Sequence, residues 1–279
     1  NRDKDPALVR REPVSFVRRG ARLNAGRQAV WDRQAERVLV DVPRGRGATS
    51  VDGQARLDWA GVFGREAPLL VDIGSGLGES TAQAAADRPD WNVLAVEVYV
   101  PGLAALMTRV EQQGLENVRA VEANAPELLD ALLTPGSVSE VWVFFPDPWH
   151  KKRHHKRRLV SPAFADRVAR VLAPGGQVIV LTPDAGHLDE LREPLGILGV
   201  EDGKVERMYE QAEGYLEQAA DPVDISFPIE LDKASVAAQV GMSPSARHIS
   251  AGELAERMAA LPPTLTVTAR ARLDRLRVV

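Results

Sequence analysis

The fold is decided by residues 71–78, which read Val71-Asp72-Ile73-Gly74-Ser75-Gly76-Leu77-Gly78. This stretch ends an apolar run that begins at Leu69, and the residues after it have the composition of a helix. Glycines permit a tight turn and let backbone N–H groups at a helix N-terminus approach a ligand closely. The stretch therefore predicts a strand, a ligand-binding turn and a helix, in that order.

Short apolar runs and helical segments alternate on both sides of this turn. Strands are predicted at 69–73, 92–97, 118–122, 138–145 and 177–181, and helices at 81–86, 102–112, 126–133 and 162–171. Pro174-Gly175-Gly176 is read as a helix stop followed by a turn. Such alternation indicates an α/β fold with a doubly wound, mainly parallel sheet, in which ligands bind beyond the carboxyl ends of the strands.

Composition narrows the class of protein. The 279 residues include 35 Lys or Arg, 39 Asp or Glu and no cysteine, and 44% are hydrophobic, as in ordinary globular proteins. The absence of cysteine excludes disulfides, thiolate zinc sites, iron–sulfur clusters and a cysteine nucleophile. No apolar run reaches the roughly 18 residues of a membrane helix, and the N-terminus is charged rather than apolar. A cytoplasmic protein without membrane contact is expected.

Charge is distributed unevenly along the chain. Residues 1–50 hold 12 Lys or Arg against 6 Asp or Glu, whereas residues 184–232 hold 14 acids against 3 bases. We divide the chain into a basic N-terminal arm and linker, 1–54, and one domain, 55–279. The arm is expected to close over a phosphate-rich partner, although an ordinary flexible terminus has the same composition.

Three polar side chains follow the first three predicted strands. Asp72 and the Gly-x-Gly-x-Gly spacing, which includes Gly74 and Gly76, favour S-adenosylmethionine over a dinucleotide, because a carboxylate attracts an ammonium group and repels a pyrophosphate. Glu97 is placed to accept hydrogen bonds from ribose hydroxyls, and Asn124 to bond an adenine edge. Each could instead be a turn residue or helix cap, but three strand ends in register favour a ligand.

The fourth strand leads into the most specific segment, Phe144-Phe145-Pro146-Asp147-Pro148-Trp149-His150. Each proline restricts the residue before it, so Phe145 and Asp147 are predicted to be extended. Trp149 could stack on a base, and the basic run that follows could hold RNA phosphates. That run comprises Lys151, Lys152, Arg153, His154, His155, Lys156, Arg157 and Arg158. The alternative is a core Trp beside a solvated loop, and six cations in the run argue against a zinc site at its histidines, so no metal is expected.

These motifs resemble the bacterial tRNA (guanine-N7-)-methyltransferase family over residues 13–184. The resemblance implies a class I methyltransferase fold and methyl transfer from S-adenosylmethionine to N7 of guanine 46 in the tRNA variable loop. It implies that Asp72, Glu97, Asn124 and Asp147 line the cofactor site, and that Asp147 is also catalytic. Lys151 and Asp184 would contact the substrate.

Guanine N7 carries a lone pair and no proton, so the reaction needs positioning and charge stabilisation more than a general base. We expect Asp147 to orient the guanine by accepting from its N1–H or exocyclic amine.

The chain departs from the family after Asp184, because no Thr-Lys-Phe-Glu motif follows. Residues 185–279 are divergent, and 264–270 and 276–279 are expected to form antiparallel strands at the sheet edge. Two alternatives therefore stay open: a noncatalytic RNA-binding relative, and a nicotinamide-dependent dehydrogenase with a similar glycine turn. Whether the protein is a monomer or a homodimer is left open as well.

Overall fold

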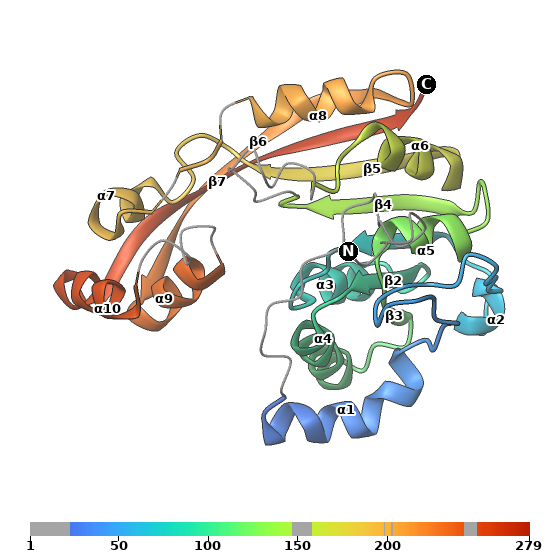
Figure 1. Cartoon of the computed structure of the whole chain (residues 1–279), viewed down its shortest axis with the longest axis horizontal. Helices are drawn as coiled ribbons and strands as arrows, with labels where there is room; N and C mark the ends of the chain where they lie inside the picture. The colour runs from blue at the N-terminus through green and yellow to red at the C-terminus, as the bar shows by residue number, and fades with distance from the viewer. Residues whose placement is uncertain (1–22, 147–157, 198, 202, 243–249) are drawn as a thin grey trace, which may run out of the picture.

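The computed structural model describes residues 23–146, 158–197, 199–201, 203–242 and 250–279 (Figure 1). Seven strands form one sheet in the order β3-β2-β1-β4-β5-β7-β6. Their bounds are β1 Leu69–Ile73, β2 Asn92–Glu97, β3 Val118–Glu122, β4 Val138–Phe144, β5 Leu172–Pro183, β6 Leu216–Asp232 and β7 Thr264–Val278. The first five strands pair in parallel, and β7 is antiparallel to both β5 and β6. This confirms the predicted mainly parallel sheet with an antiparallel edge.

Helices cover both faces of the sheet. Their bounds are α1 Ala25–Val38, α2 Trp59–Phe63, α3 Glu79–Asp87, α4 Val100–Gln113, α5 Ala125–Ala131, α6 Pro162–Val171, η3 Asp189–Leu191, α7 Arg192–Leu195, α8 Lys204–Ala212, α9 Lys233–Met242 and α10 Ala251–Ala260. One hydrophobic core joins α1, α3 and α4 to one face of the sheet. A larger core joins α2, α5, α6 and α8 to the other face. Burial of apolar surface on both faces is what makes the central strands continuous apolar runs.

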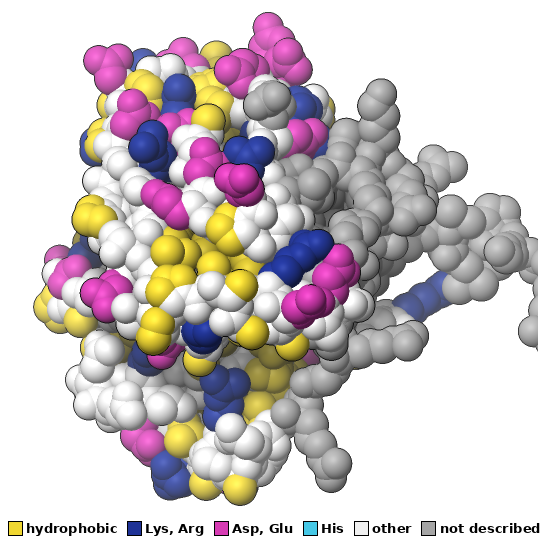
Figure 2. Space-filling view, turned by 90° about the vertical axis from the view of Figure 1, so that its left-hand side faces the viewer, with side chains coloured by type: hydrophobic (Ala, Val, Ile, Leu, Met, Phe, Trp, Pro, Cys, Tyr) yellow, Lys and Arg dark blue, Asp and Glu magenta, His cyan; other side chains and the backbone are white. Residues whose placement is uncertain are grey.

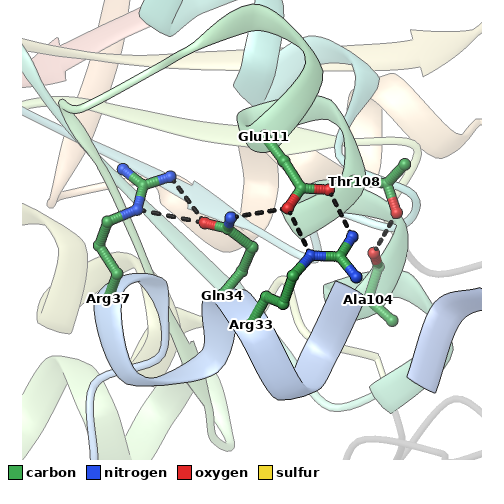
Figure 3. Close-up of polar contacts among 6 residues, drawn as sticks. All are labelled: Arg33, Gln34, Arg37, Ala104, Thr108 and Glu111. Carbon is green, nitrogen blue, oxygen red and sulfur yellow. Dashed lines mark hydrogen bonds and ion pairs between the residues drawn. The ribbon is translucent and has the colours of Figure 1, made fainter. Parts of the chain in front are cut away.

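The helix α1 docks on α4 through a polar cluster (Figure 3). The guanidinium of Arg33 donates to both carboxylate oxygens of Glu111, at 3.0 and 2.9 Å, and Gln34 donates to the same carboxylate at 2.9 Å. These hydrogen bonds lower the pKa of Glu111 to about 2. Arg37 bonds Gln34 and the carbonyl oxygen of Leu115. The cluster holds residues 25–38 against the sheet-bearing part of the chain.

Two predicted details are wrong near β4 and β5. Phe145 is not extended: its φ is 50°, in the left-handed region, because its N–H donates to Leu181 on β5 while the following Pro146 is buried. The helix α6 ends at Val171, as predicted, but Pro174-Gly175-Gly176 is no simple turn before the strand, since β5 begins at Leu172 opposite Val138. Gln177 then pairs with Glu140, so the intervening residues bulge out of the ladder.

The C-terminal strands also differ from expectation. The segments 264–270 and 276–279 are not separate strands but lie on one continuous strand, β7, which ends at Val278. Its partner β6 was not predicted, because most of its residues are exposed or half-buried and carry no clear apolar alternation. Together they supply the antiparallel edge.

The antiparallel pair β6–β7 extends beyond the carboxyl end of β5. Pro183, the last residue of β5, pairs with Ala271, so residues 264–270 of β7 continue past it and pair with 226–232 of β6. We call these outer parts, together with η3, α7, α9 and α10, the distal lobe. A third hydrophobic core fills it, made of Leu188, Leu191, Leu195, Val236, Val240, Met258 and Val267. Figure 1 shows the lobe at the left, at the end of the two long strands.

Figure 2 shows the molecule from the side of Figure 1 on which the distal lobe lies. Hydrophobic side chains gather near the middle of this view, and acidic and basic side chains are interspersed around them. Within the described residues, no helix has the length and hydropathy needed to cross a membrane.

Candidate active site

The first site residue, Asp72, lies in β1 near the carboxyl end of the strand. Its side chain is buried, with 2% of the residue exposed, and the hydroxyl of Thr81 on α3 donates to its Oδ2 at 2.6 Å. Burial raises the pKa of Asp72 to about 6, although the Thr81 hydrogen bond opposes the rise. The carboxylate is therefore oriented by α3 and held in a location where its charge is costly in the absence of a cation.

The glycine turn joins β1 to α3 in a conformation that requires glycine. Gly74, Gly76 and Gly78 all have positive φ, at 76°, 59° and 78°. Gly102 of α4 packs directly on the turn, since a Cβ at that position would lie 2.2 Å from the carbonyl oxygen of Gly76. The backbone of the turn is thus fixed by close packing as well as by its own dihedral angles.

Glu97 at the end of β2 connects the second strand to this turn. Its Oε2 accepts the N–H of Gly76 at 2.8 Å, and its Oε1 accepts those of Val98 and Tyr99 at 2.7 and 2.9 Å. Burial raises the pKa of Glu97 and the three backbone hydrogen bonds oppose the rise. A carboxylate has about four acceptor sites, so Glu97 keeps capacity for a ligand hydroxyl while its position is fixed.

Asn124 follows β3 and precedes α5. It is 1% exposed, and its main-chain N–H donates to the carbonyl oxygen of Thr49 at 2.7 Å. Its side-chain Oδ1 is buried without a hydrogen-bond partner in the described part of the chain, and so is the hydroxyl oxygen of Ser75 in the glycine turn. Buried polar atoms are normally paired, so an unpaired acceptor at a strand end indicates a ligand donor.

The residues at these three strand ends fit S-adenosylmethionine. The structure places a carboxylate at the end of β1, a second carboxylate at the end of β2, and an unpaired amide oxygen after β3. These groups complement an ammonium group, ribose hydroxyls and an adenine amine. The parallel register brings all three to the same edge of the sheet, as the sequence predicts.

A loop beside Asn124 was not predicted from the sequence to belong to the site. Residues predicted to be linker form a loop closed by an antiparallel bridge between Arg44 and Val51. Arg44 donates to the carbonyl oxygen of Glu122, and the N–H of Val51 donates to Glu127 of α5 at 2.9 Å. The partners are 76 to 78 residues apart in sequence, so no local pattern in the sequence could reveal this loop as part of the site.

On the substrate side, Asp184 follows β5 and is exposed. Its Oδ1 accepts the N–H of Ala185, and its carbonyl oxygen accepts the N–H of His187 at 3.0 Å. The carbonyl oxygen of Arg270 on β7 accepts the N–H of Asp184 at 3.2 Å. The predicted substrate residue therefore lies where β5 meets the base of the distal lobe.

Asp147, predicted to be catalytic and to line the cofactor site, and most of the predicted RNA contacts lie outside the described residues. These are Asp147, Trp149, Lys151, Lys152, Arg153, His154, His155, Lys156 and Arg157. Arg158 is described, and it donates to both carboxylate oxygens of Glu201 at 2.9 and 2.7 Å. RNA contact by Arg158 stays a prediction. Among the described residues, no group of three His, Asp or Glu side chains could hold a metal ion.

Comparison with known proteins decides the family. Residues 66–208, just over half of the chain, match the family model described as "Putative methyltransferase". The tRNA (guanine-N(7)-)-methyltransferase of Nocardioides sp. is 43% identical over 202 residues, which cover 72% of this chain and 79% of that protein. The chain belongs to the bacterial tRNA (guanine-N7-)-methyltransferase family. The predicted resemblance is confirmed.

Two further relatives carry the same name as the Nocardioides protein. The Paenarthrobacter aurescens protein is 55% identical over 183 residues, 66% of this chain and 61% of that protein. The Arthrobacter sp. protein is 55% identical over 181 residues, 65% of this chain and 57% of that protein. The chain thus spans about three fifths of the length of these two relatives.

Among solved structures, a variant of the 16S rRNA (adenine(1408)-N(1))-methyltransferase from Catenulisporales acidiphilia gives a TM-score of 0.48 at 18% identity, covering 85% of this chain and 96% of that chain. The fold assignment rests on strand order and on the family model.

Proposed function

We propose that this protein transfers the methyl group of S-adenosylmethionine to N7 of guanine 46 in the variable loop of tRNA. The observation that carries the proposal is the meeting of Asp72, Glu97 and Asn124 at one sheet edge, in a chain of this family. The names of the relatives support tRNA as the substrate class.

The described residues have separate tasks in holding the cofactor. Asp72, oriented by Thr81, would meet the ammonium group of the methionine moiety and so offset the cost of its own burial. Glu97 would accept from the ribose, and the unpaired Oδ1 of Asn124 would accept from the adenine amine. When bound, S-adenosylmethionine supplies an electrophilic methyl group on a sulfonium.

The RNA side of the reaction requires little proton chemistry. Guanine N7 presents an in-plane lone pair, so the residues around it need to fix the ring and accommodate the positive charge that develops on it. We assign this orientation to Asp147, and contact with the surrounding RNA to Lys151, Asp184 and the basic run. We also propose that tRNA is the partner of this protein and that the reaction takes place in the cytoplasm.

A noncatalytic RNA-binding relative is the second candidate, because the family's Thr-Lys-Phe-Glu motif is missing after Asp184. The intact cofactor residues favour the enzyme over it. The dehydrogenase alternative is disfavoured by the position of Asp72, whose buried carboxylate would repel a pyrophosphate at the glycine turn.

The cofactor half of the proposal is tested by calorimetric titration with S-adenosylmethionine and with NAD. We expect S-adenosylmethionine to bind and NAD not to bind, and Asn124→Ala to weaken binding by about tenfold, the cost of roughly one hydrogen bond. Gln113→Ala, which removes an exposed amide at the end of α4, is the matched control and should bind as the wild type does. Preferential binding of NAD would contradict the proposal.

The transfer half is tested with labelled S-adenosylmethionine and unmodified tRNA, followed by mapping of the modified base. Label on a variable-loop guanine, lost in Asp147→Ala, is expected. Cofactor and tRNA binding without any transfer would favour the noncatalytic relative.

A further inference from the structure

Phe145 is a large hydrophobic residue exposed at the carboxyl edge of the sheet. It comes directly after the last residue of β4, and 47% of it is exposed. It lies two residues before Asp147 in the sequence. An exposed aromatic ring at the substrate edge is a surface on which a base can stack.

The backbone holds Phe145 in an unfavourable conformation. Its φ of 50° lies in the left-handed region, which residues other than glycine rarely adopt, and the next residue is a proline. Two contacts keep it there: its N–H donates to the carbonyl oxygen of Leu181 at 2.7 Å, and Pro146 is buried. Conformations of this kind persist only where the surroundings determine them, and they cluster at functional sites.

The ring of Phe145 is braced from a neighbouring segment. Its centroid lies 6.1 Å from that of His187, with the two ring planes 42° apart. His187 is itself fixed, because its Nδ1 lies 2.7 Å from the carbonyl oxygen of Arg270 and 3.0 Å from the Arg270 amide nitrogen. Segments that follow β4 and β5 and the middle of β7 therefore converge on one exposed ring.

A second exposed phenylalanine shows what distinguishes this position. Phe227 on β6 is 50% exposed, but it pairs with Ala269 in a regular ladder and its φ is not positive. Exposure alone therefore does not separate the two residues. Phe145 differs from Phe227 in its positive φ, in its ring contact with His187 and in its position at the carboxyl end of a parallel strand.

We propose that the ring of Phe145 is the platform on which the target guanine stacks, an inference that rests on the proposed function. The lone pair of N7 lies in the plane of the purine, so a residue that grips the face of the base leaves N7 and the Watson–Crick edge open. A base held in this way leaves its edge open to the methyl donor while Phe145 fixes the ring plane.

The test compares steady-state methyl transfer to tRNA for the wild type, Phe145→Ala, Phe145→Tyr and the matched control Phe227→Ala. Loss of a stacked base contact is worth about 1–3 kcal/mol, so Phe145→Ala should lower kcat/KM for tRNA by roughly 5- to 150-fold. Phe145→Tyr keeps the ring and should stay within about threefold of wild type, as should Phe227→Ala. S-adenosylmethionine affinity should be unchanged in all four proteins.

A fifth protein, Phe145→Gly, separates stacking from folding. Glycine adopts the left-handed conformation without strain, so this variant should melt at or above the temperature of Phe145→Ala and lose kcat/KM to the same extent. Wild-type activity in either Phe145→Ala or Phe145→Gly would overturn the inference about Phe145 and leave the proposed function standing. Absence of transfer by the wild type itself would overturn the proposed function, and the inference with it.

Discussion

Replacing the buried carboxylate of Asp72 by an amide should stabilise the protein and impair cofactor binding at once. Burial moves the pKa of Asp72 from 3.8 to about 6, and each pH unit corresponds to about 1.36 kcal/mol. The ionised form therefore costs the unliganded fold about 3 kcal/mol at pH 7. The amide introduced by Asp72→Asn is not charged, yet its oxygen can still accept from Thr81. This variant should thus be more stable than wild type by up to this amount.

The direction in which stability changes with pH follows from proton binding by Asp72. Between pH 4 and pH 6 the folded state retains the Asp72 proton while the unfolded state has lost it, so wild-type stability falls as pH rises through this window. The variant lacks this titration, and the difference between the two proteins should vanish near pH 4. At about 2.1 cal/mol/K per residue, 3 kcal/mol corresponds to a rise of about 5 °C in Tm for 279 residues.

The assay is thermal or urea unfolding from pH 4 to pH 8 without ligand, paired with calorimetric titration of S-adenosylmethionine. Asp72→Asn should bind the cofactor about 10- to 150-fold more weakly, the loss of a hydrogen bond between charged groups. Asp87→Asn, at an exposed acid of α3, should change stability by less than about 0.5 kcal/mol. A variant that is less stable than wild type at pH 7, or that binds the cofactor equally well, would refute the reasoning.

Three further predictions concern other contacts. Gly102→Ala should force the glycine turn to shift, at about 1–3 kcal/mol, and weaken S-adenosylmethionine binding, whereas Gly53→Ala, with open space around it, should not; calorimetry distinguishes them. The pKa of Glu111 is lowered to about 2, so its contribution to the docking of α1 is lost as pH falls from about 4.5 toward 2, while the buried Val30 and Val38 still pack α1 on the core; hydrogen exchange in α1 should become faster over this range and Glu111→Gln should abolish the pH dependence. Tyr209 donates to the buried Asp274 at 2.8 Å and its pKa is raised to about 12, so Tyr209→Phe should cost about 1–3 kcal/mol in urea unfolding and remove the tyrosine that stays un-ionised at pH 11. Unchanged stability in that variant would show that the buried carboxylate does not need the phenol.

The central strands could be predicted because strands that are buried on both faces have continuous apolar runs in the sequence. β1, β2 and β3 have the predicted bounds, and the helices between them differ by one or two residues at their ends. Parallel pairing then brings the predicted residues Asp72, Glu97 and Asn124 to one edge without further information.

The antiparallel edge could not be predicted in the same way. β6 is an edge strand with few buried residues, interrupted by two prolines and by register shifts, and it is specified by pairing with β7 rather than by its own pattern. The distal lobe buries its own core only once α7, α9 and α10 assemble around the β6–β7 pair.

The conformation of Phe145 and the position of the loop around Thr49 could not be predicted for a different reason, because long-range contacts determine both. The general preference of a residue before proline is extended, and at Phe145 a sheet hydrogen bond and the buried Pro146 override it. The loop reaches the site through hydrogen bonds to Asn124, Glu122 and Glu127, far away in the chain. Local sequence carries no signal for contacts of that range.

The most direct test of the proposed reaction uses two synthetic tRNAs that differ only at the target position, with guanosine in one and 7-deazaguanosine, which has carbon in place of N7, in the other. Labelled methyl transfer from S-adenosylmethionine is measured for both. The proposal predicts label on the guanosine tRNA and none on the 7-deaza tRNA, with equal binding of both. Equal labelling of the two tRNAs, or none of either by a chain that binds cofactor and tRNA, would contradict it.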